Sequence, residues 1–166
     1  MALIMQSKKI STILSKAEVL KGLGSDDLKV LLAQPQIEKV DKDQVVITEG
    51  QHGEALYIIL SGQFKVLLEP GSSHNPNRFA QVYLATLKPS DCFGEYSFID
   101  SEPASASVIA TEPSELFKLT KSDFDRLSVA HERIVRIIYY NLLRLLIHRL
   151  RKKDKELDFD AEDFDQ

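Results

Sequence analysis

Short segments rich in β-branched and aromatic residues follow one another from residue 36 to residue 119, and this pattern constrains the fold most. Turn signals separate the segments. Among them, the Ser61-Gly62 step predicts a tight hairpin and the polar run 71–78 predicts an exposed hairpin loop. Seven or eight strands at this spacing predict a sandwich or barrel, which hides its sheet edges. The segments read IEKV, QVVITE, ALYIIL, QFKVLLE, FAQVYLATL, SASVIA and ELFKL.

Helical patterns flank this β-rich region on both sides. Residues 8–33 are predicted to form helices in pieces. After the last strand, Thr120 or Ser122 is predicted to cap a helix that ends near Ala130. A longer helix is predicted from about residue 132 to residue 153.

The apolar side chains of this long helix cover more of its circumference than packing on one domain requires. At about 100° per residue they span roughly 220°, whereas a stripe somewhat over 100° is enough. We expect one side to pack on the barrel and the other on a partner, most simply a second copy of the chain. The alternative is that the N-terminal helices cover it. Arg149 falls inside the apolar arc, between Ile138 and Leu142, so it either extends to solvent or reaches into a pocket below.

The composition fits one domain without a membrane span. The chain has 166 residues, 43% of them hydrophobic, and no apolar run of about 18 residues. Its first residues lack the layout of a signal peptide. The single cysteine, Cys92, excludes an internal disulfide and is predicted to be a buried apolar residue. A cytoplasmic location is therefore expected.

The net charge of −4 is unevenly distributed along the chain. Residues 154–166 carry seven acids and one lysine, or −6, which leaves +2 on the rest. The near-neutral body lacks the basic footprint of a nucleic-acid-binding protein. We therefore expect an N-terminal helical extension at 1–16, one domain at 17–153 and an acidic disordered tail at 154–166. The tail repeats the triplet Asp-Phe-Asp, which would also suit a docking peptide.

Residues 92–110, CFGEYSFIDSEPASASVIA, carry the strongest functional signal. Gly94 lets the backbone approach a ligand, and a short helical turn after Glu95 directs amide groups toward the loop, which favours an anion. The carboxylate of Glu95 would repel a phosphate but accept a hydrogen bond from a sugar hydroxyl. A ligand with both a phosphate and a ribose fits this combination. The loop also offers three hydroxyl donors, Ser97, Ser105 and Ser107.

Four segments between about residues 20 and 150 resemble the cyclic-nucleotide-binding domain of catabolite-activator-like regulators, protein kinase regulatory subunits and gated ion channels. They read VLKGLGSDDLKVLLAQ, VVITEGQHGEALYIILSGQFKVL, LKPSDCFGEYSFIDSEPASASVIA and ELFKLTKSDFDRL. The resemblance implies a mainly β fold over residues 17–153: an eight-stranded, jelly-roll-like β-roll with N-terminal helices and a long C-terminal helix. Asp43 and Ser90 stand where the family often has turn glycines, and both residue types suit turns.

The family's phosphate-binding cassette corresponds to residues 93–108. The resemblance implies that Glu95 holds the ribose 2′-hydroxyl, that cassette amides face the cyclic phosphate, and that the long helix covers the base as a lid. The amides in question belong to Tyr96, Ser97, Ser105 and Ala106. With Arg149 added as a cation, the expected ligand-binding residues are Phe93, Gly94, Glu95, Tyr96, Ser97, Ala104, Ser105, Ala106 and Arg149.

One residue departs from the pattern of the family members that bind cyclic nucleotides. These carry an arginine after the cassette proline, whereas here Ala104 follows Pro103. Such a charge-assisted contact is worth about 1.5–3 kcal/mol, so its loss predicts binding weaker by roughly tenfold to more than a hundredfold. Binding of cAMP or cGMP is therefore doubtful from the cassette alone. Arg149, or less directly Arg78 in the hairpin loop, is the candidate replacement.

Two interpretations of the function stay open. The first is a stand-alone, non-enzymatic sensor that binds a cyclic nucleotide weakly, or another anion, and signals to a separate effector protein. The second is a degenerate, ligand-free module for dimerisation and protein docking through the long helix and the acidic tail. No DNA-binding domain is expected, since only thirteen residues follow Lys153 and they are acidic. No metal site or catalysis is expected either, because no nucleophile–base motif occurs and the histidines are scattered, at His52, His74, His131 and His148.

Overall fold

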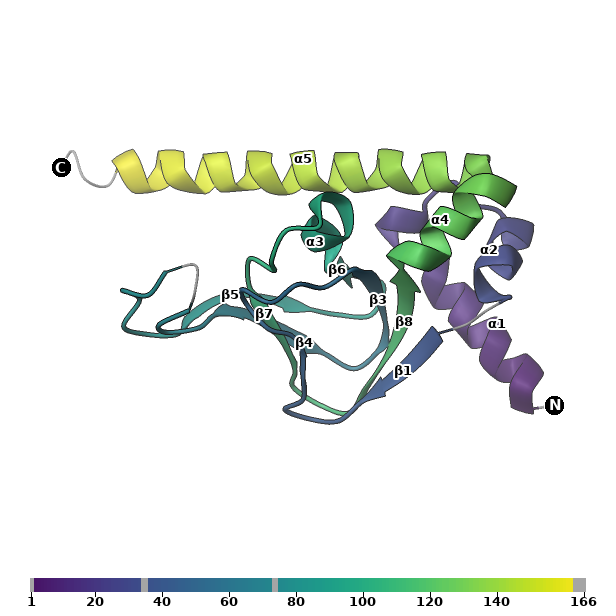
Figure 1. Cartoon of the computed structure of the whole chain (residues 1–166), viewed down its shortest axis with the longest axis horizontal. Helices are drawn as coiled ribbons and strands as arrows, with labels where there is room; N and C mark the ends of the chain where they lie inside the picture. The colour runs from purple at the N-terminus through teal and green to yellow at the C-terminus, as the bar shows by residue number, and fades with distance from the viewer. Residues whose placement is uncertain (1, 34–35, 73–74, 163–166) are drawn as a thin grey trace.

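Eight antiparallel strands form two four-stranded sheets among the described residues of the computed structural model (Figure 1). The structure describes residues 2–33, 36–72 and 75–162. One sheet has the order β1-β8-β3-β6 and the other the order β2-β7-β4-β5, which confirms the predicted β-roll. The strands are β1 Gln36–Val40, β2 Val45–Ile47, β3 Ala55–Ser61, β4 Phe64–Leu68, β5 Val82–Leu87, β6 Cys92–Phe93, β7 Ser107–Ala110 and β8 Ser114–Thr120.

A small apolar core lies between the two sheets. Ile59 and Leu116 come from the first sheet, and Phe64 and Val108 from the second, and all four are buried. Phe93 joins them and stacks on Tyr57, with ring centroids 5.1 Å apart. The apolar residues of the predicted strand segments therefore also form this core.

Several of the predicted turns use left-handed backbone. Asp43 and Ser90 have φ angles of 65° and 75°, so the residues that replace the family's turn glycines keep a glycine-like conformation. The Ser61-Gly62 step is not a hairpin, because β3 and β4 lie in different sheets. Gly62 has a φ of 87°, and a Cβ atom there would overlap the side chain of Ser114. The turn thus carries the chain closely past β8 from one sheet to the other.

The helices gather at one end of the β-roll, except for α3 and the long α5 (Figure 1). Thr120 caps α4 as predicted, because its Oγ1 accepts a hydrogen bond of 3.1 Å from the amide of Asp123. The carboxylate of Asp123 in turn accepts from Thr120, which completes a capping box. The helices are α1 Ala2–Leu14, the 3₁₀ turn η1 Glu18–Leu20, α2 Ser25–Leu32, α3 Glu95–Asp100, α4 Lys121–Ala130 and α5 Glu132–Glu162.

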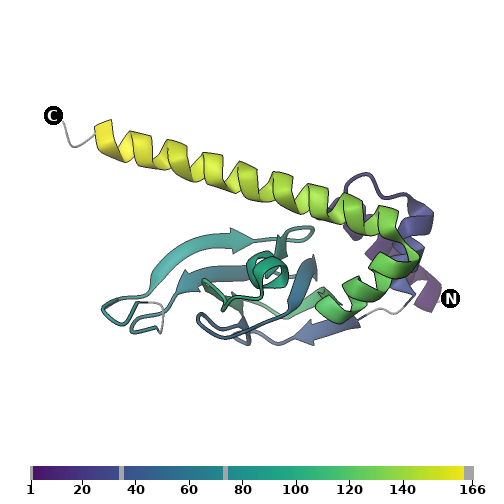
Figure 2. The same ribbon diagram turned by 45° about the horizontal axis from the view of Figure 1, so that its top comes forward.

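Helix α5 crosses the β-roll and extends beyond it (Figure 2). The prediction that it ends near Lys153 is wrong: it continues to Glu162, and so includes most of the segment predicted as a tail. Residues 163–166 lie outside the described part of the chain. Within that part, no helix, α5 included, is long and apolar enough to cross a membrane.

One face of α5 is buried and the opposite apolar face is exposed. The N-terminal elements cover part of the buried face, since the Asn141 side chain donates to the carbonyls of Val19, at 3.1 Å, and Lys21, at 2.8 Å. The N-terminal elements, which were the alternative to a partner as a cover for this helix, thus cover part of its buried face and leave the opposite face exposed. The buried apolar residues are Ile134, Val135, Ile138 and Leu142, and the exposed ones are Tyr139, Tyr140, Leu143, Ile147 and Leu150.

Candidate functional site

A pocket of about 330 Å³ lies between the cassette and α5. All nine residues expected to bind a ligand line it, although they come from β6, α3, the loop before β7 and α5. Their role as ligand contacts stays a prediction, but their convergence on one cavity is a property of the fold. The remaining lining residues are Ile47, Val66, Ala85, Leu87, Cys92, Val108 and Lys152.

The first wall of the pocket is the turn from β6 into α3. Gly94 has a φ of 82°, and a Cβ atom there would lie 2.6 Å from the carbonyl oxygen of Ala55, so only glycine fits. Glu95 begins α3 and is buried. Phe98 anchors the helix, because it is fully buried and packs edge-to-face on Phe124 of α4, with ring centroids 5.1 Å apart. The glycine and the aromatic anchor together fix the position of the Glu95 carboxylate.

The second wall is formed by residues 104–107, here called the cassette arm. The amide of Ala104 donates to the carbonyl of Gln51 at 2.9 Å, and its carbonyl accepts from the amide of Gly50 at 2.8 Å. Ser107 is almost fully buried, and its hydroxyl accepts a 2.9 Å hydrogen bond from the amide of Glu49. Of the three serines predicted to offer hydroxyl donors, Ser97 and Ser105 line the pocket and Ser107 does not.

Arg149 reaches into the pocket from α5. Its Nη1 pairs with Oε1 of Glu95, and its Nη2 donates to the carbonyl of Cys92 at 3.2 Å. The Glu95 side chain is 6% exposed and the Arg149 side chain 36%. At about 100° per residue, Arg149 points within about 20° of the buried residues Ile138 and Leu142, which explains why it faces the cassette. Of the two alternatives for this arginine, the structure shows the one in which it enters the pocket.

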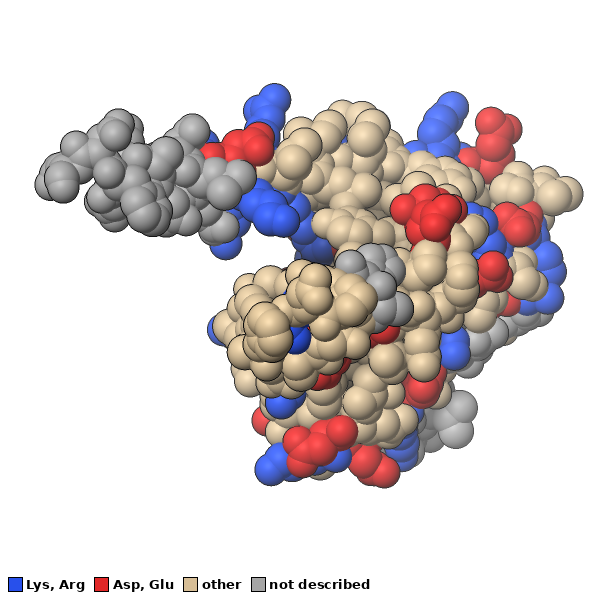
Figure 3. Space-filling view, turned by 60° about the vertical axis from the view of Figure 1, so that its left-hand side comes forward, with Lys and Arg blue, Asp and Glu red and all other residues tan. Residues whose placement is uncertain are grey.

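A second cation at the pocket, Lys152, was missed from the sequence. It follows Arg149 by three residues and therefore lies on the same side of the helix, which is the signal that would have identified it. Lys152 also borders an outer recess, whose lining has three basic residues and one acidic residue: Arg151, Lys152, Lys155 and Asp154, together with His148. Figure 3 shows basic side chains along the part of α5 that overhangs this hollow. Because clustered positive charges raise the local concentration of anions, these basic side chains favour an anionic ligand at the pocket mouth.

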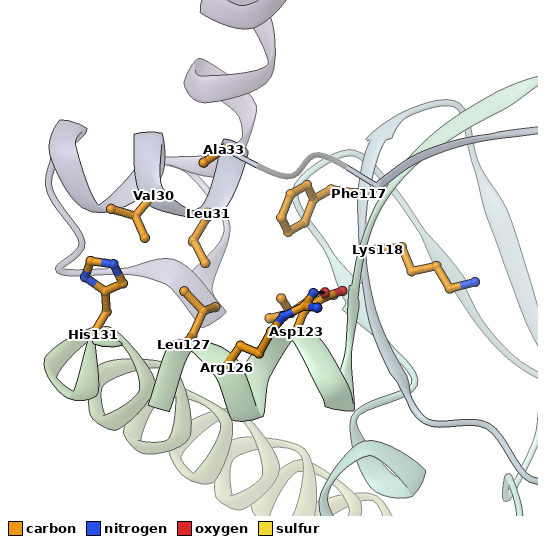
Figure 4. A pocket seen from close by; sticks show the side chains of 10 residues that line it. Val30, Leu31, Ala33, Phe117, Lys118, Asp123, Arg126, Leu127 and His131 are labelled. Atoms are coloured by element: carbon orange, nitrogen blue, oxygen red, sulfur yellow. Dashed lines mark hydrogen bonds and ion pairs between the residues drawn. The ribbon is translucent and has the colours of Figure 1, made fainter. Parts of the chain in front are cut away.

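Another pocket, of about 250 Å³, lies between α2, β8 and α4 (Figure 4). Apolar side chains such as Leu31, Phe117 and Leu127 form its walls. Asp123 and Arg126 at its edge pair with each other, and Asp123 also caps α4. Its mainly apolar walls and paired charges do not offer the anion-binding chemistry of the cassette pocket.

The other candidates named from the sequence, a cysteine, the histidines and Arg78, form no metal site among the described residues. Burial raises the pKa of the Cys92 thiol to about 11, as expected for an unreactive buried cysteine. His148 is exposed on α5, and His74 lies outside the described residues. No cluster of three histidine, cysteine or carboxylate side chains that could hold a metal occurs in the described residues. Arg78 was predicted to be exposed, but its side chain is only 14% exposed because it pairs with Glu49.

Comparison with known proteins identifies a family and several relatives that the chain resembles. The family model described as the cyclic nucleotide-binding domain matches residues 37–131. The chain is 31% identical over 137 residues to the cyclic AMP receptor protein of Thermus thermophilus, covering 82% of this chain and 59% of the receptor. It is 34% identical over 88 residues to the cAMP-dependent protein kinase regulatory subunit of Emericella nidulans, covering 52% of this chain and 21% of that subunit.

Solved structures give the same fold. The crystal structure of the Thermus thermophilus catabolite activator protein matches with a TM-score of 0.73 and 29% identity, covering 87% of this chain and 63% of that one. A cyclic nucleotide-binding domain from Methylobacillus flagellatus matches with a TM-score of 0.76 at 23% identity, covering 92% and 82% of the two chains. The chain thus spans only part of the relatives it matches, 59% of the T. thermophilus receptor and less of the kinase subunit.

Proposed function

Because the chain belongs to the family of cyclic nucleotide-binding domains, we propose that it is a non-enzymatic regulatory module that binds cAMP or cGMP weakly and signals through α5. The observation that carries this proposal is the position of Arg149. This arginine lies in the pocket beside Glu95, opposite the arm on which Ala104 replaces the expected arginine. The site therefore contains a cation, but the cation belongs to the helix and not to the cassette.

Each half of a cyclic nucleotide has a matching partner in this arrangement. The cyclic phosphate would bond Arg149 and the amides of Ser105 and Ala106. An arginine carries five N–H donors, and the contacts of Arg149 with Glu95 and Cys92 use two of them. The ribose hydroxyl would donate to the Glu95 carboxylate, which keeps acceptor positions beside its bond to Arg149. Lys152 adds positive charge at the mouth.

The placement of the cation links binding to the position of the helix. A ligand shifts a conformational equilibrium only if it interacts differently with the two states. A phosphate bonded to Arg149 interacts directly with α5, so any displacement of the helix changes the binding energy. The basic and acidic segments beyond Arg149 would move with it, because they belong to the same helix.

Hydrogen exchange tests this coupling. Saturating cAMP is expected to change the amide exchange of residues 147–153 and of the cassette arm, while β1 in the other sheet keeps its native rates. Adenosine, which lacks the phosphate, serves as the control ligand and is expected to change neither segment. Exchange in α5 that is the same with and without bound cAMP would contradict the proposed signalling route.

The exposed apolar face of α5 supports a homodimer. Tyr140, Leu143, Ile147 and Leu150, here called the exposed seam, follow one another at spacings of three, four and three residues. They are 43–61% exposed. This spacing is typical of the seam at which two helices form a coiled coil. We therefore infer that two copies of the chain pair through α5.

Replacing Leu143 and Ile147 together with glutamate is expected to convert the dimer to a monomer at tens of micromolar, since four like charges would meet in the seam. Sedimentation velocity measures the change. Val129→Glu is the matched control, because Val129 is 89% exposed on α4 and away from the seam. A native chain that is already monomeric at this concentration would show that the seam does not join two copies.

The second candidate is the ligand-free module for dimerisation and docking. It is favoured by Ala104 in the cassette and by the Glu95 carboxylate, which is already paired with Arg149. In this case the Arg149–Glu95 pair would simply hold α5 on the β-roll. Nucleotide titration separates the two candidates, because a purely structural pair predicts no binding.

A further inference from the structure

A buried ion pair joins two loops next to the pocket without lining it. Nη1 of Arg78 lies 2.9 Å from each carboxylate oxygen of Glu49. The Glu49 side chain is 1% exposed and the Arg78 side chain 14%, so the pair is almost fully removed from water. A buried charge is stable only when it is paired and hydrogen-bonded, and the surroundings of Glu49 meet this requirement.

The hairpin between β4 and β5 wraps around the Glu49 carboxylate. The hydroxyl of Ser72 donates to Oε1, and the amide of Glu69 donates to Oε2, both at 2.7 Å. Arg78 also donates to the carbonyl of Glu69 at 2.7 Å. Burial raises the pKa of Glu49, but the bonds from Ser72, Arg78 and Glu69 outweigh it and leave this pKa lowered. The carboxylate is therefore charged at neutral pH and fixes the hairpin to the loop after β2.

The same loop is bonded to the cassette arm. The amide of Glu49 donates to the Ser107 hydroxyl, and two backbone bonds join Gly50 and Gln51 to Ala104. Both ends of the arm are thus held by residues 49–51. The two residues between these ends, 105 and 106, line the pocket and carry the amides expected to meet a phosphate. A continuous set of contacts therefore runs from Arg78 through Glu49 to the amides of the pocket.

We propose that Arg78 is a positioning residue of the cassette pocket, which it stabilises from outside by holding Glu49 and, through it, the cassette arm. This role rests on the proposed function. Arg78 does not touch the pocket, so it does not replace the missing charge of the cassette. Instead it orders the arm that lacks that charge. Preorganised amides bind an anion more tightly than mobile ones, because less conformational entropy is lost on binding.

Arg78→Gln tests the proposal, with Arg133→Gln as the matched control. Arg133 also pairs with a carboxylate, that of Asp27, but on α5 and α2, away from the cassette. In Arg78→Gln, amide exchange in the arm is expected to accelerate about tenfold or more, with β1 and β8 unchanged. The Kd for cAMP is expected to rise about fivefold or more. The control is expected to change neither quantity. Arg78→Lys is expected to restore both in part, since the contacts of Arg78 with Glu49, Glu69 and Ser72 all come from one nitrogen, Nη1, whose place a lysine ammonium can take.

A purely structural role would give a different result. Arg78→Gln would then lower the unfolding midpoint and leave local exchange in the arm within twofold of native, which overturns the proposal. If Arg78→Gln does not fold, the double variant Glu49→Gln/Arg78→Gln decides, because it leaves no unpaired buried charge. Native exchange in its arm overturns the proposal, and accelerated exchange supports it. The exchange measurement needs no ligand. If the native chain fails to bind cAMP, the proposed function is removed, but the exchange measurement still decides whether Arg78 positions the arm.

Discussion

Arg149→Ala is expected to weaken cAMP binding by roughly tenfold to a hundredfold. Hydrogen bonds to a charged group are worth about 1.5–3 kcal/mol, and in this pocket Arg149 is the arginine beside the Glu95 carboxylate. The substitution also removes the bond that α5 makes to the carbonyl of Cys92. The loss of affinity is thus expected together with looser attachment of the helix.

Two control variants separate these effects. Arg136→Ala removes an exposed arginine from the same helix and is expected to leave the Kd unchanged. Arg149→Lys keeps the charge but not the forked donors, so an intermediate affinity is expected. Isothermal calorimetry gives the affinities, and circular dichroism shows whether each variant is folded. Equal affinity for Arg149→Ala and the native chain would mean that the helix supplies no ligand contact.

Ala104→Arg is expected to tighten cAMP binding by about tenfold to a hundredfold. Ala104 lines the pocket, so a longer side chain at this position would enter the cavity. The two backbone bonds that join Ala104 to the loop after β2 do not involve its side chain and should survive. The new guanidinium would face the same phosphate as the cassette amides.

Charge and volume are separated by Ala104→Gln, which fills similar space without a cation. Calorimetric titration with cAMP and with cGMP is expected to show a gain for the arginine variant only. A Kd for Ala104→Arg no tighter than that of Ala104→Gln would mean that the cassette arm does not present its side chain to the phosphate. A gain from an undetectable native affinity would instead favour the ligand-free docking module.

Local pattern was sufficient to predict most of the scaffold. The strands follow from short β-branched runs and turn signals, and the start of α4 follows from a threonine placed three residues before an aspartate. The convergence of the cassette on one pocket followed from the family resemblance. The predicted end of α5 was wrong because the acidic segment was taken as a disordered tail, although acidic residues are compatible with a helix.

Long-range pairing could not be predicted in the same way. Glu49 and Arg78 are separated by 29 positions, and each lies in what looks like an ordinary polar turn. Their pairing depends on how β4 and β5 bring the hairpin back over the loop after β2, which no local pattern encodes. Arg149 was noticed because it is a charged residue inside an apolar helical arc, but that pattern left two alternatives open, and the structure was needed to show that the side chain enters the pocket.

Calorimetric titration of the native chain with cAMP and cGMP at low ionic strength tests the proposed sensor most directly. Binding with a Kd in the micromolar range, about −8 kcal/mol, is the predicted result, since Arg149, Glu95 and the cassette amides then act as a site without the family's arginine. Absence of heat for both nucleotides at millimolar concentration would contradict the sensor. The Arg149–Glu95 pair would then be a structural contact that holds α5 on the β-roll.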